Sequence, residues 1–231
     1  MAAGSKSEAT RQRLVEAATQ LFRDQGFERT TMRGVAAAAG VSTGNAYYYF
    51  SSKDAIVAEL YRSLQDEHRS AALPLLREGH NLGEHLRVIL QANLDVLAPY
   101  HSLGHQFLKT AALPAPQKTR QGTGAAQAVQ ADAAQVGRGK SIAVYRQAVQ
   151  AARPQPPLAV RDDLPELLWL VHMGVTLFWV YDSSPGQARS RRLVANTAPL
   201  VAKLVILSRL PVVRNIVEDV VKLLRGARSH D

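Results

Sequence analysis

The sequence predicts an all-α protein in which a small N-terminal helical domain precedes a larger C-terminal helical domain. No stretch of the 231 residues alternates apolar and polar side chains with the β-branched enrichment of a strand. Apolar residues instead recur every three or four positions, as they do along one face of a helix. Prolines and glycines interrupt this pattern and mark the turns. We expect a disordered tail over residues 1–7, a three-helix domain over 8–53 and a helical domain over 54–231.

The first expected helix ends at Gly26, a residue type that readily adopts the left-handed conformation found after helices. Phe27 can then fold back as the apolar contact that often accompanies such a glycine. The buried side of the helix is formed by Leu14, Ala17, Ala18, Leu21 and Phe22. Residues 1–7 are small and polar and lack the apolar run of a secretory signal.

Residues 31–50, TMRGVAAAAGVSTGNAYYYF, predict two short helices joined by a tight turn. Thr31 and Ser42 are suitable N-caps, because a hydroxyl can accept from an unpaired backbone N–H of the first turn. Gly40 can supply the left-handed residue that ends the first of these helices. Four apolar residues of that helix share one face: Met32, Val35, Ala36 and Ala39. This spacing is typical of a helix-turn-helix, whose second helix enters the DNA major groove.

The second helix has two distinct faces. Ala46, Tyr49 and Phe50 are expected to pack on neighbouring helices, whereas Gly44, Tyr47 and Tyr48 project outward, with Thr43 beside them. Small residues let the helix N-terminus approach the groove, and its backbone N–H groups favour phosphate. Tyrosine hydroxyls reach phosphates, and Asn45 could read an adenine edge. For Tyr49 we favour a packing role over DNA contact.

Residues 11–62 resemble the DNA-binding domain of TetR-type transcriptional regulators. The resemblance is carried by Leu14 to Ala18, Leu21-Phe22, Gly26-Phe27, Thr30 to Met32, Val35-Ala36, Ala39 to Ser42, Gly44, Tyr47 to Phe50 and Ser52 to Asp54. It covers just over a fifth of the chain, without gaps. The family implies a dimeric, all-helical regulator, usually a repressor, that a small molecule releases from a palindromic operator.

The resemblance places seven residues at positions that often touch DNA: Thr31, Arg33, Thr43, Gly44, Tyr47, Tyr48 and Lys53. Ser42, at the start of the reading helix, and Asn45, at a variable position, complete the predicted DNA-binding set. Two residues depart from the family pattern. Gly34 stands where an acidic residue often completes a capping box with Thr31, and Ala46 stands where a larger aliphatic residue is usual.

Helices are expected throughout the rest of the chain. Asp54 begins a long helix that Pro74 stops, and Asn81 with Glu84 forms a start resembling a capping box. Residues 125–152 are rich in alanine and glutamine and contain Gly137 and Gly139 as interruptions, and their second half, 142–152, is the more convincing helix. The expected helices after residue 54 span about 54–73, 81–99, 102–113, 142–152, 163–181, 187–207 and 212–224, with a loop marked by Pro114, Pro116, Gly122 and Gly124.

The 163–181 helix is apolar nearly all round, so it must be covered on every side. A symmetric partner would cover it more easily than one chain of this size. The TetR resemblance implies that two late helices of each subunit form a four-helix homodimer interface. A simple buried core helix is the alternative. Its fifteen-residue uncharged stretch is shorter than the twenty or so residues of a membrane span, so no membrane association is expected.

The net charge of +9 is unevenly distributed. Residues 1–62 carry eight basic and six acidic side chains, residues 63–183 carry eleven and ten, and residues 184–231 carry nine and three. The excess therefore lies mainly at the C-terminus, far from the motif, and we interpret it as a solvated face rather than a second DNA site. The absence of cysteine excludes disulfides and thiolate metal sites, which fits a cytoplasmic protein.

No enzymatic function is predicted. The sequence has neither a glycine-rich phosphate loop nor a nucleophile elbow, so we expect no catalytic residue and no cofactor. His101 and His105 have the spacing of a metal-binding pair on one helical face, but they lack the glutamate of a zinc protease. Surface or hydrogen-bonded histidines are the favoured interpretation, so no metal site is predicted.

The TetR resemblance places an effector pocket in the larger domain. By residue type, we expect its lining to include Phe107, Tyr145, Trp169, His172 and Met173. Such a pocket would take a small, mostly apolar or aromatic effector with one or two hydrogen-bonding groups. The sequence thus predicts a ligand-responsive repressor that binds double-stranded operator DNA. A ligand-independent DNA-binding or partner-recruiting protein on the same fold is the alternative.

Overall fold

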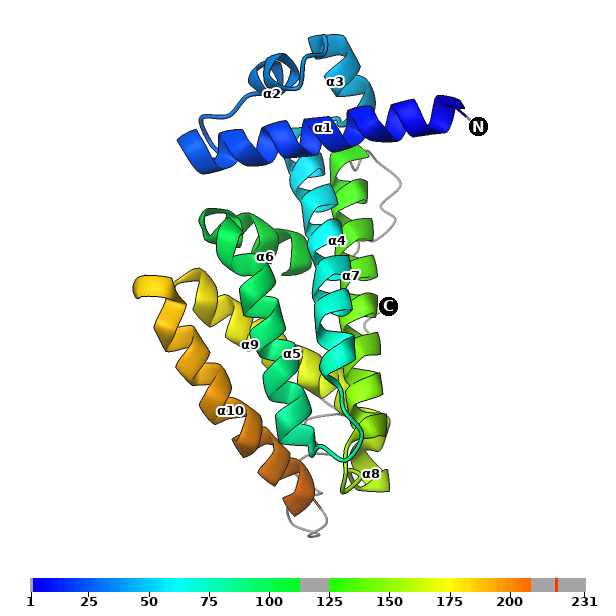
Figure 1. Ribbon diagram of the computed structural model, residues 1–231, viewed down its shortest axis with the longest axis vertical. Helices are drawn as coiled ribbons and strands as arrows, with labels where there is room; N and C mark the ends of the chain where they lie inside the picture. Colours follow the sequence, from blue (N-terminus) through cyan, green and yellow to red (C-terminus); the bar gives the residue numbers. More distant parts are fainter. Residues whose placement is uncertain (1, 113–124, 209–218, 220–231) are drawn as a thin grey trace. The chain divides into compact units, whose positions relative to one another are not determined.

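The computed structural model describes residues 2–112, 125–208 and 219, and every regular element within these ranges is helical (Figure 1). The all-α prediction is therefore confirmed. The chain divides into two compact units, which combine residues 1–66 with 99–138 and residues 67–98 with those from 139 onward. The first unit includes most of α4 (Lys53–Ala72) and the later segment 99–138, whereas the expected domain boundary at residue 53 remains a prediction.

Each unit contains helices from distant parts of the sequence. The first unit holds α1 (Ala2–Gln25), α2 (Met32–Ala38), α3 (Thr43–Tyr49), most of α4 (Lys53–Ala72), α6 (Gly104–Ala112) and the first part of α7 (Ala125–Ala151). The second unit holds the remaining turns of α4 and α7 with α5 (Leu82–Leu97), α8 (Leu158–Arg161), α9 (Leu164–Val180) and α10 (Ala188–Leu207). Short 3₁₀ segments are η1 (Leu73–Leu75), η2 (Ala98–Leu103) and η3 (Pro185–Gln187).

Helix α1 extends further toward the N-terminus than expected. We expected residues 1–7 to form a disordered tail, whereas the structure continues α1 back to Ala2. The Thr10 hydroxyl donates to the carbonyl oxygen of Lys6 at 3.0 Å, one helical turn earlier. The C-terminal end agrees with the prediction, because Gly26 has a φ of +86° and the Phe27 ring lies 5.2 Å from that of Phe22.

Helix α7 corrects the prediction of an interrupted segment. It is continuous from Ala125 to Ala151 and passes through both Gly137 and Gly139. Gly137 lies against α4, where an added Cβ would approach the Tyr61 ring to 2.8 Å and the Gln65 side chain to 3.4 Å. Gly139 has open space around it. The first glycine thus permits close helix packing, which the sequence pattern alone cannot distinguish from a helix break.

Helix α5 begins with the predicted capping box. The Asn81 side chain accepts from the Glu84 N–H at 3.0 Å, and the Glu84 carboxylate accepts from the Asn81 N–H at 2.7 Å. Helix α10 packs closely on α5 near Gly83, whose Cβ position would lie 3.2 Å from that of Ala202 and 3.3 Å from the Ala198 carbonyl oxygen. Small residues therefore allow these two helices to approach.

Helices α9 and α10 are joined by a turn that Asp182 stabilises. Its carboxylate accepts from the backbone N–H and hydroxyl groups of Ser184 and Ser190, at distances of 2.6 to 3.0 Å. Burial by itself raises the pKa of Asp182, but these hydrogen bonds outweigh burial and hold the pKa well below its usual range. The carboxylate is therefore charged and acts as a cap for α10.

The later elements agree with most of the remaining expectations. The predicted helices at 163–181 and 187–207 correspond to α9 and α10, while α8 was not expected. The segment expected to begin its helix at Ser102 starts α6 only at Gly104, after the 3₁₀ segment η2. The expected loop at 114–124 and the expected helix at 212–224 lie outside the described residues, apart from residue 219.

Candidate DNA-binding surface

Helices α2 and α3 form the predicted helix-turn-helix. The Thr31 side chain caps α2 by accepting from the Gly34 N–H at 3.1 Å. Two further hydrogen bonds close its other end, from the Gly40 N–H to the Ala37 carbonyl oxygen at 3.1 Å and from Val41 to Ala36 at 3.0 Å. With Gly40 at a φ of +68°, this is a Schellman motif. The turn therefore directs the chain into α3 with all of these end groups hydrogen-bonded.

The N-terminus of α3 is open to solvent. The Ser42 side chain accepts from the Asn45 N–H at 3.1 Å, and residues 42–45 are all exposed. The remaining N–H groups of the first turn, together with the helix dipole, give this end a partial positive charge. An anion such as a phosphate can therefore be bound here without any further side chain.

The two predicted faces of α3 are separated in the structure. Ala46 is fully buried and Phe50, which ends the helix, is 3% exposed. Tyr47 and Tyr48 are 53% and 82% exposed, so their outward position is confirmed. Tyr49 is half-buried, and its ring meets that of Tyr48 edge-on at 5.2 Å. Packing therefore accounts for only part of the Tyr49 surface.

The flanking residues differ in how they are held. Thr31, the N-cap of α2, and Arg33, in its first turn, are exposed. The Lys53 ammonium instead donates to the carbonyl oxygens of Phe27 at 2.7 Å and Glu28 at 3.3 Å, and lies 4.4 Å from the centre of the Phe27 ring. Sequence reasoning assigned Lys53 to DNA alone. These contacts hold the turn between α1 and α2.

An ion-pair network between α1 and α4 was not expected from the sequence. The Glu59 carboxylate of α4 accepts from Arg11 of α1 at 2.6 Å and from Arg62 at 2.7 Å. The Arg11 guanidinium carbon also lies 4.7 Å from the centre of the Phe50 ring. Because Arg11 and Glu59 are 48 residues apart, no helical spacing rule could have paired them.

The residues predicted to line an effector pocket fall in both units. Phe107 lies in the first unit, against the rings of Tyr61 at 6.1 Å and Tyr100 at 6.3 Å. The other four, Tyr145, Trp169, His172 and Met173, lie in the second unit, and the last three share α9. Trp169 and Met173 are half-buried, whereas Tyr145 and His172 are buried.

Tyr145 and His172 belong to a buried polar cluster. The Tyr145 hydroxyl and His172 Nδ1 are 3.0 Å apart, and the His68 ring centre lies 5.6 Å from that of His172. Burial and, to a smaller extent, the nearby His68 together lower the pKa of His172 to about 3. Burial also lowers the pKa of His68, although its bond to the Ile89 carbonyl oxygen partly opposes this. Both rings are therefore neutral at pH 7.

One buried acceptor extends this cluster. The Asn93 amide donates to the Thr176 hydroxyl at 3.3 Å, one helical turn beyond His172. Its carbonyl oxygen Oδ1 is buried and accepts no hydrogen bond within the described part of the chain. A buried amide oxygen of this kind is costly unless it meets a donor, so water or a ligand hydroxyl would stabilise it.

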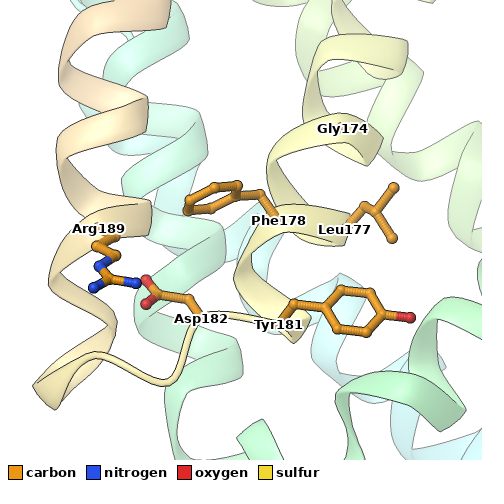
Figure 2. A pocket seen from close by; sticks show the side chains of 6 residues that line it. All are labelled: Gly174, Leu177, Phe178, Tyr181, Asp182 and Arg189. Carbon is orange, nitrogen blue, oxygen red and sulfur yellow. The ribbon is translucent and has the colours of Figure 1, made fainter.

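Two surface hollows flank α9 in the second unit. One of about 500 Å³ lies beside Leu177, Phe178 and Tyr181, with Leu177 and Tyr181 projecting away from Arg189 (Figure 2). The other, of about 270 Å³, is lined mainly by leucines and valines of α9 and α10. None of the five predicted pocket residues lines either hollow.

Other site types find little support in the described residues. Within residues 2–112, 125–208 and 219, no three His, Cys, Asp or Glu side chains gather as a metal site. His101 lies in η2 and His105 in α6, so the pair does not occupy one continuous α-helix. Among the helices of the described ranges, none is both long enough and apolar enough to span a bilayer.

Two family models match the chain. Residues 14–60 match a model of bacterial regulatory proteins of the tetR family. Residues 85–223 match a tetracyclin repressor-like C-terminal domain, and this second match alone covers more than half of the sequence. Together they include the helix-turn-helix and most of the second unit.

Curated relatives match over shorter regions. The HTH-type transcriptional repressor KstR2 of Rhodococcus jostii is 28% identical over 92 residues, which are 40% of this chain and 45% of that protein. The HTH-type transcriptional regulator UidR of Escherichia coli is 31% identical over 68 residues, which are 29% of this chain and 34% of that protein. The chain thus spans less than half the length of these curated relatives.

Solved structures share the fold over most of the chain. A TetR transcriptional regulator from Nitrosomonas europaea aligns with a TM-score of 0.59 and 17% identity, over 83% of this chain and 97% of that one. FadR of Thermus thermophilus, solved in complex with lauroyl-CoA, aligns with a TM-score of 0.54 and 18% identity, over 81% of this chain and 92% of that one. The SmeT–triclosan complex aligns with a TM-score of 0.56 and 19% identity, over 84% of this chain and 91% of that one.

Proposed function

The chain belongs to the TetR family of bacterial regulatory proteins, and we propose that it is a transcriptional repressor released from its operator by a small molecule. In this proposal a homodimer binds a palindromic DNA site in the cytoplasm. A small, mostly apolar effector then lowers the affinity for DNA. The protein has no enzymatic role.

The observation that carries the proposal is the exposed outer face of α3. Its first residues are small and its last two outward residues are tyrosines. A helix presented in this way fits the major groove, where base edges carry a distinct pattern of donors and acceptors. Two consecutive tyrosines that are both exposed would otherwise leave an unfavourable apolar surface in water.

We assign roles to the surface residues by their chemistry. Asn45 can form two hydrogen bonds with an adenine edge, and the small Gly44 allows a close approach. The hydroxyl, guanidinium and ammonium groups around it would bind phosphates and set the register of the protein on DNA. The phosphate-binding set comprises Thr31, Arg33, Ser42, Thr43, Tyr47, Tyr48 and Lys53.

The proposed homodimer rests on exposed apolar side chains of α9 and α10. Leu177 and Phe178 on α9 and Leu200 and Leu204 on α10 are each 43% to 57% exposed. Side chains of this size are seldom left exposed in such numbers on two adjacent helices. A symmetric second copy would cover them and would present two reading helices to successive major grooves of a palindrome.

We propose that the effector binds within the second unit. Among the predicted lining residues, this proposal keeps Tyr145, Trp169, His172 and Met173. The nearby polar groups are neutral at pH 7, so they favour an uncharged hydroxyl or amide over a carboxylate or phosphate. FadR was solved with lauroyl-CoA and SmeT with triclosan. Triclosan and the lauroyl chain agree with the expected apolar class, whereas the CoA part carries several phosphate charges and lies outside it.

Release from DNA would follow from linkage. An effector that binds more tightly to a conformation with wrongly spaced reading helices shifts the population toward that conformation. The same coupling makes operator DNA weaken effector binding by an equal factor. Both ligands therefore act on one equilibrium, whichever binds first.

The test is selection of bound duplexes from a random pool, followed by measurement of affinity for the selected site. We expect a palindromic sequence with half-sites about one helical turn apart, or a multiple of it. Tyr48→Phe, which removes one phosphate-binding hydroxyl, should weaken this binding by about three- to tenfold.

Tyr181→Phe is the matched control, because Tyr181 is another largely exposed tyrosine, in the second unit, and the change removes its hydroxyl while keeping the ring. It should bind the selected duplex like the wild type. A pool that yields no symmetric sequence would overturn the proposed function. Equal losses of affinity in Tyr48→Phe and Tyr181→Phe would instead show that α3 is not part of the DNA-binding surface.

A further inference from the structure

The reading helix α3 has a small buried footprint. It contains seven residues, and only Ala46 among them is buried. Alanine offers little contact area to the helices beneath it, so it fixes the orientation of α3 only weakly. The next buried side chain is that of Phe50, the residue that caps α3 and donates its N–H to the Ala46 carbonyl oxygen. The position of the Phe50 ring therefore controls the orientation of the C-terminal end of α3.

Arg11 of α1 lies against that ring. Its guanidinium carbon is 4.7 Å from the ring centre, within the range of a cation–π interaction. Glu59 of α4 holds the same guanidinium by a 2.6 Å hydrogen bond. The Glu59 carboxylate is in turn held by Arg62 at 2.7 Å, and all three charged side chains are partly buried. Arg11 is thus fixed on one side by a carboxylate and on the other by an aromatic ring.

We infer that Arg11 and Glu59 are positioning residues, which orient α3 through Phe50 and thereby sharpen the base specificity of the DNA-binding surface. This inference rests on the proposed function, since it concerns how the same surface is aimed. The Arg11–Glu59 pair has no net charge, so its effect on DNA recognition is geometric. Losing it lets α3 adopt several orientations, which weakens hydrogen bonds to base edges more than contacts to phosphates.

The experiment compares four proteins: Arg11→Gln, Glu59→Gln, the double variant and Arg13→Gln. Arg13 is the matched control, because it lies on the same helix and is exposed, with its guanidinium donating to the Thr10 hydroxyl at 3.2 Å. Each protein is measured on the duplex selected by the wild type and on a scrambled duplex of equal length. The ratio of these two affinities reports specificity separately from electrostatic attraction.

We expect Arg11→Gln and Glu59→Gln each to lower this ratio about tenfold, mainly by weakening binding to the selected duplex. The double variant should be no worse than the more affected single variant, because both changes remove the same support. Arg13→Gln should keep the wild-type ratio. Repeating the selection with Arg11→Gln should give a broader base preference at the positions that the wild type specifies.

Equal ratios for Arg11→Gln and Arg13→Gln would overturn the inference. Equal weakening of binding to both duplexes by Arg11→Gln would also overturn it, since that result would show that Arg11 contacts phosphate. Additive losses in the double variant would separate Arg11 from Glu59 and reject their joint role. Far-ultraviolet circular dichroism checks folding. Should Glu59→Gln unfold, Arg11→Lys removes the planar guanidinium while keeping its charge, and it should still lower the ratio. A wild type that selects no duplex would instead count against the proposed function itself.

Discussion

His172 is a titratable side chain in the core of the second unit, with only 4% of its surface exposed. Its neighbours are the Tyr145 hydroxyl and the neutral ring of His68. Neither compensates a positive charge, so protonation of the folded protein is unfavourable. An unfolded histidine, by contrast, takes up a proton near pH 6.5. Folding of this unit is therefore linked to pH through a residue with no direct part in the DNA-binding surface.

We expect the second unit to lose stability as the pH falls below about 6.5. Because the folded pKa of His172 is lowered to about 3, this contribution is complete above the unfolded pKa and is lost between pH 6.5 and pH 3. One such histidine lowers the free energy of unfolding by about 2 kcal/mol between pH 7.5 and pH 5. Urea unfolding at several pH values should show a correspondingly shallower dependence for His172→Gln.

Tyr145→Phe provides the comparison. It removes the hydroxyl partner and leaves the titrating ring, so it should lower stability by about 1 kcal/mol at every pH and keep the wild-type slope. An unchanged slope for His172→Gln would show that other groups cause the acid sensitivity.

Some site residues could be predicted from the sequence, and the reason is that their environment is local. The outward position of Tyr47 and Tyr48 follows from the helical repeat and from the burial of Ala46. The partners of Arg11 and Lys53 could not be predicted, because they lie on other helices and no spacing rule connects them. For the same reason, residue type alone could not show that Phe107 packs in a different unit from Tyr145.

At the scale of elements, glycine has two roles that a single sequence does not distinguish. Gly26 and Gly40 have positive φ angles and end helices, as predicted from the apolar pattern that stops before them. Gly137 and Gly139 lie inside α7, where the pattern around them is weak in alanine- and glutamine-rich sequence. What allows α7 to continue through Gly137 is its packing against Tyr61 of α4, which is visible only in three dimensions.

The two glycines of α7 should respond in opposite ways to alanine. Gly139→Ala fills open space and gains helix propensity, so it should stabilise the protein by up to about 1 kcal/mol. Gly137→Ala gains the same propensity but places a methyl group 2.8 Å from the Tyr61 ring. That ring is packed against Phe107 and cannot move without cost, and overpacking of this kind costs about 1–3 kcal/mol. Urea unfolding should therefore rank Gly139→Ala above wild type and Gly137→Ala below it. Equal stabilisation by both would mean that Tyr61 yields easily.

For the whole molecule, the exposed apolar residues of α9 and α10 decide the assembly state that we propose. Leu204→Asp places a charge at a position that is half exposed in one chain, so it should leave a monomer folded. In a dimer the same charge would be buried against the partner subunit, which would cost about 3 kcal/mol or more. We therefore expect sedimentation velocity to detect folded monomers of Leu204→Asp at micromolar concentration and dimers of the wild type.

Gln147→Glu is the control for charge, since Gln147 is an exposed polar residue of the second unit that lies on α7 rather than on α9 or α10. This variant should remain dimeric. A wild-type protein that sediments as a stable monomer at micromolar concentration would reject the proposed dimer and, with it, recognition of a palindrome by two subunits.

The shortness of α2 and α3 has a consequence for how the protein gains and loses activity. Seven residues are too few to hold a helix in water, because nucleation costs more than so few hydrogen bonds return. Both helices therefore form only together with the longer helices that surround them. Unfolding of those longer helices therefore removes the DNA-binding surface as well. A change in α1 that weakens folding by about 1.4 kcal/mol would then raise the inactive fraction tenfold, although it touches no residue that meets DNA.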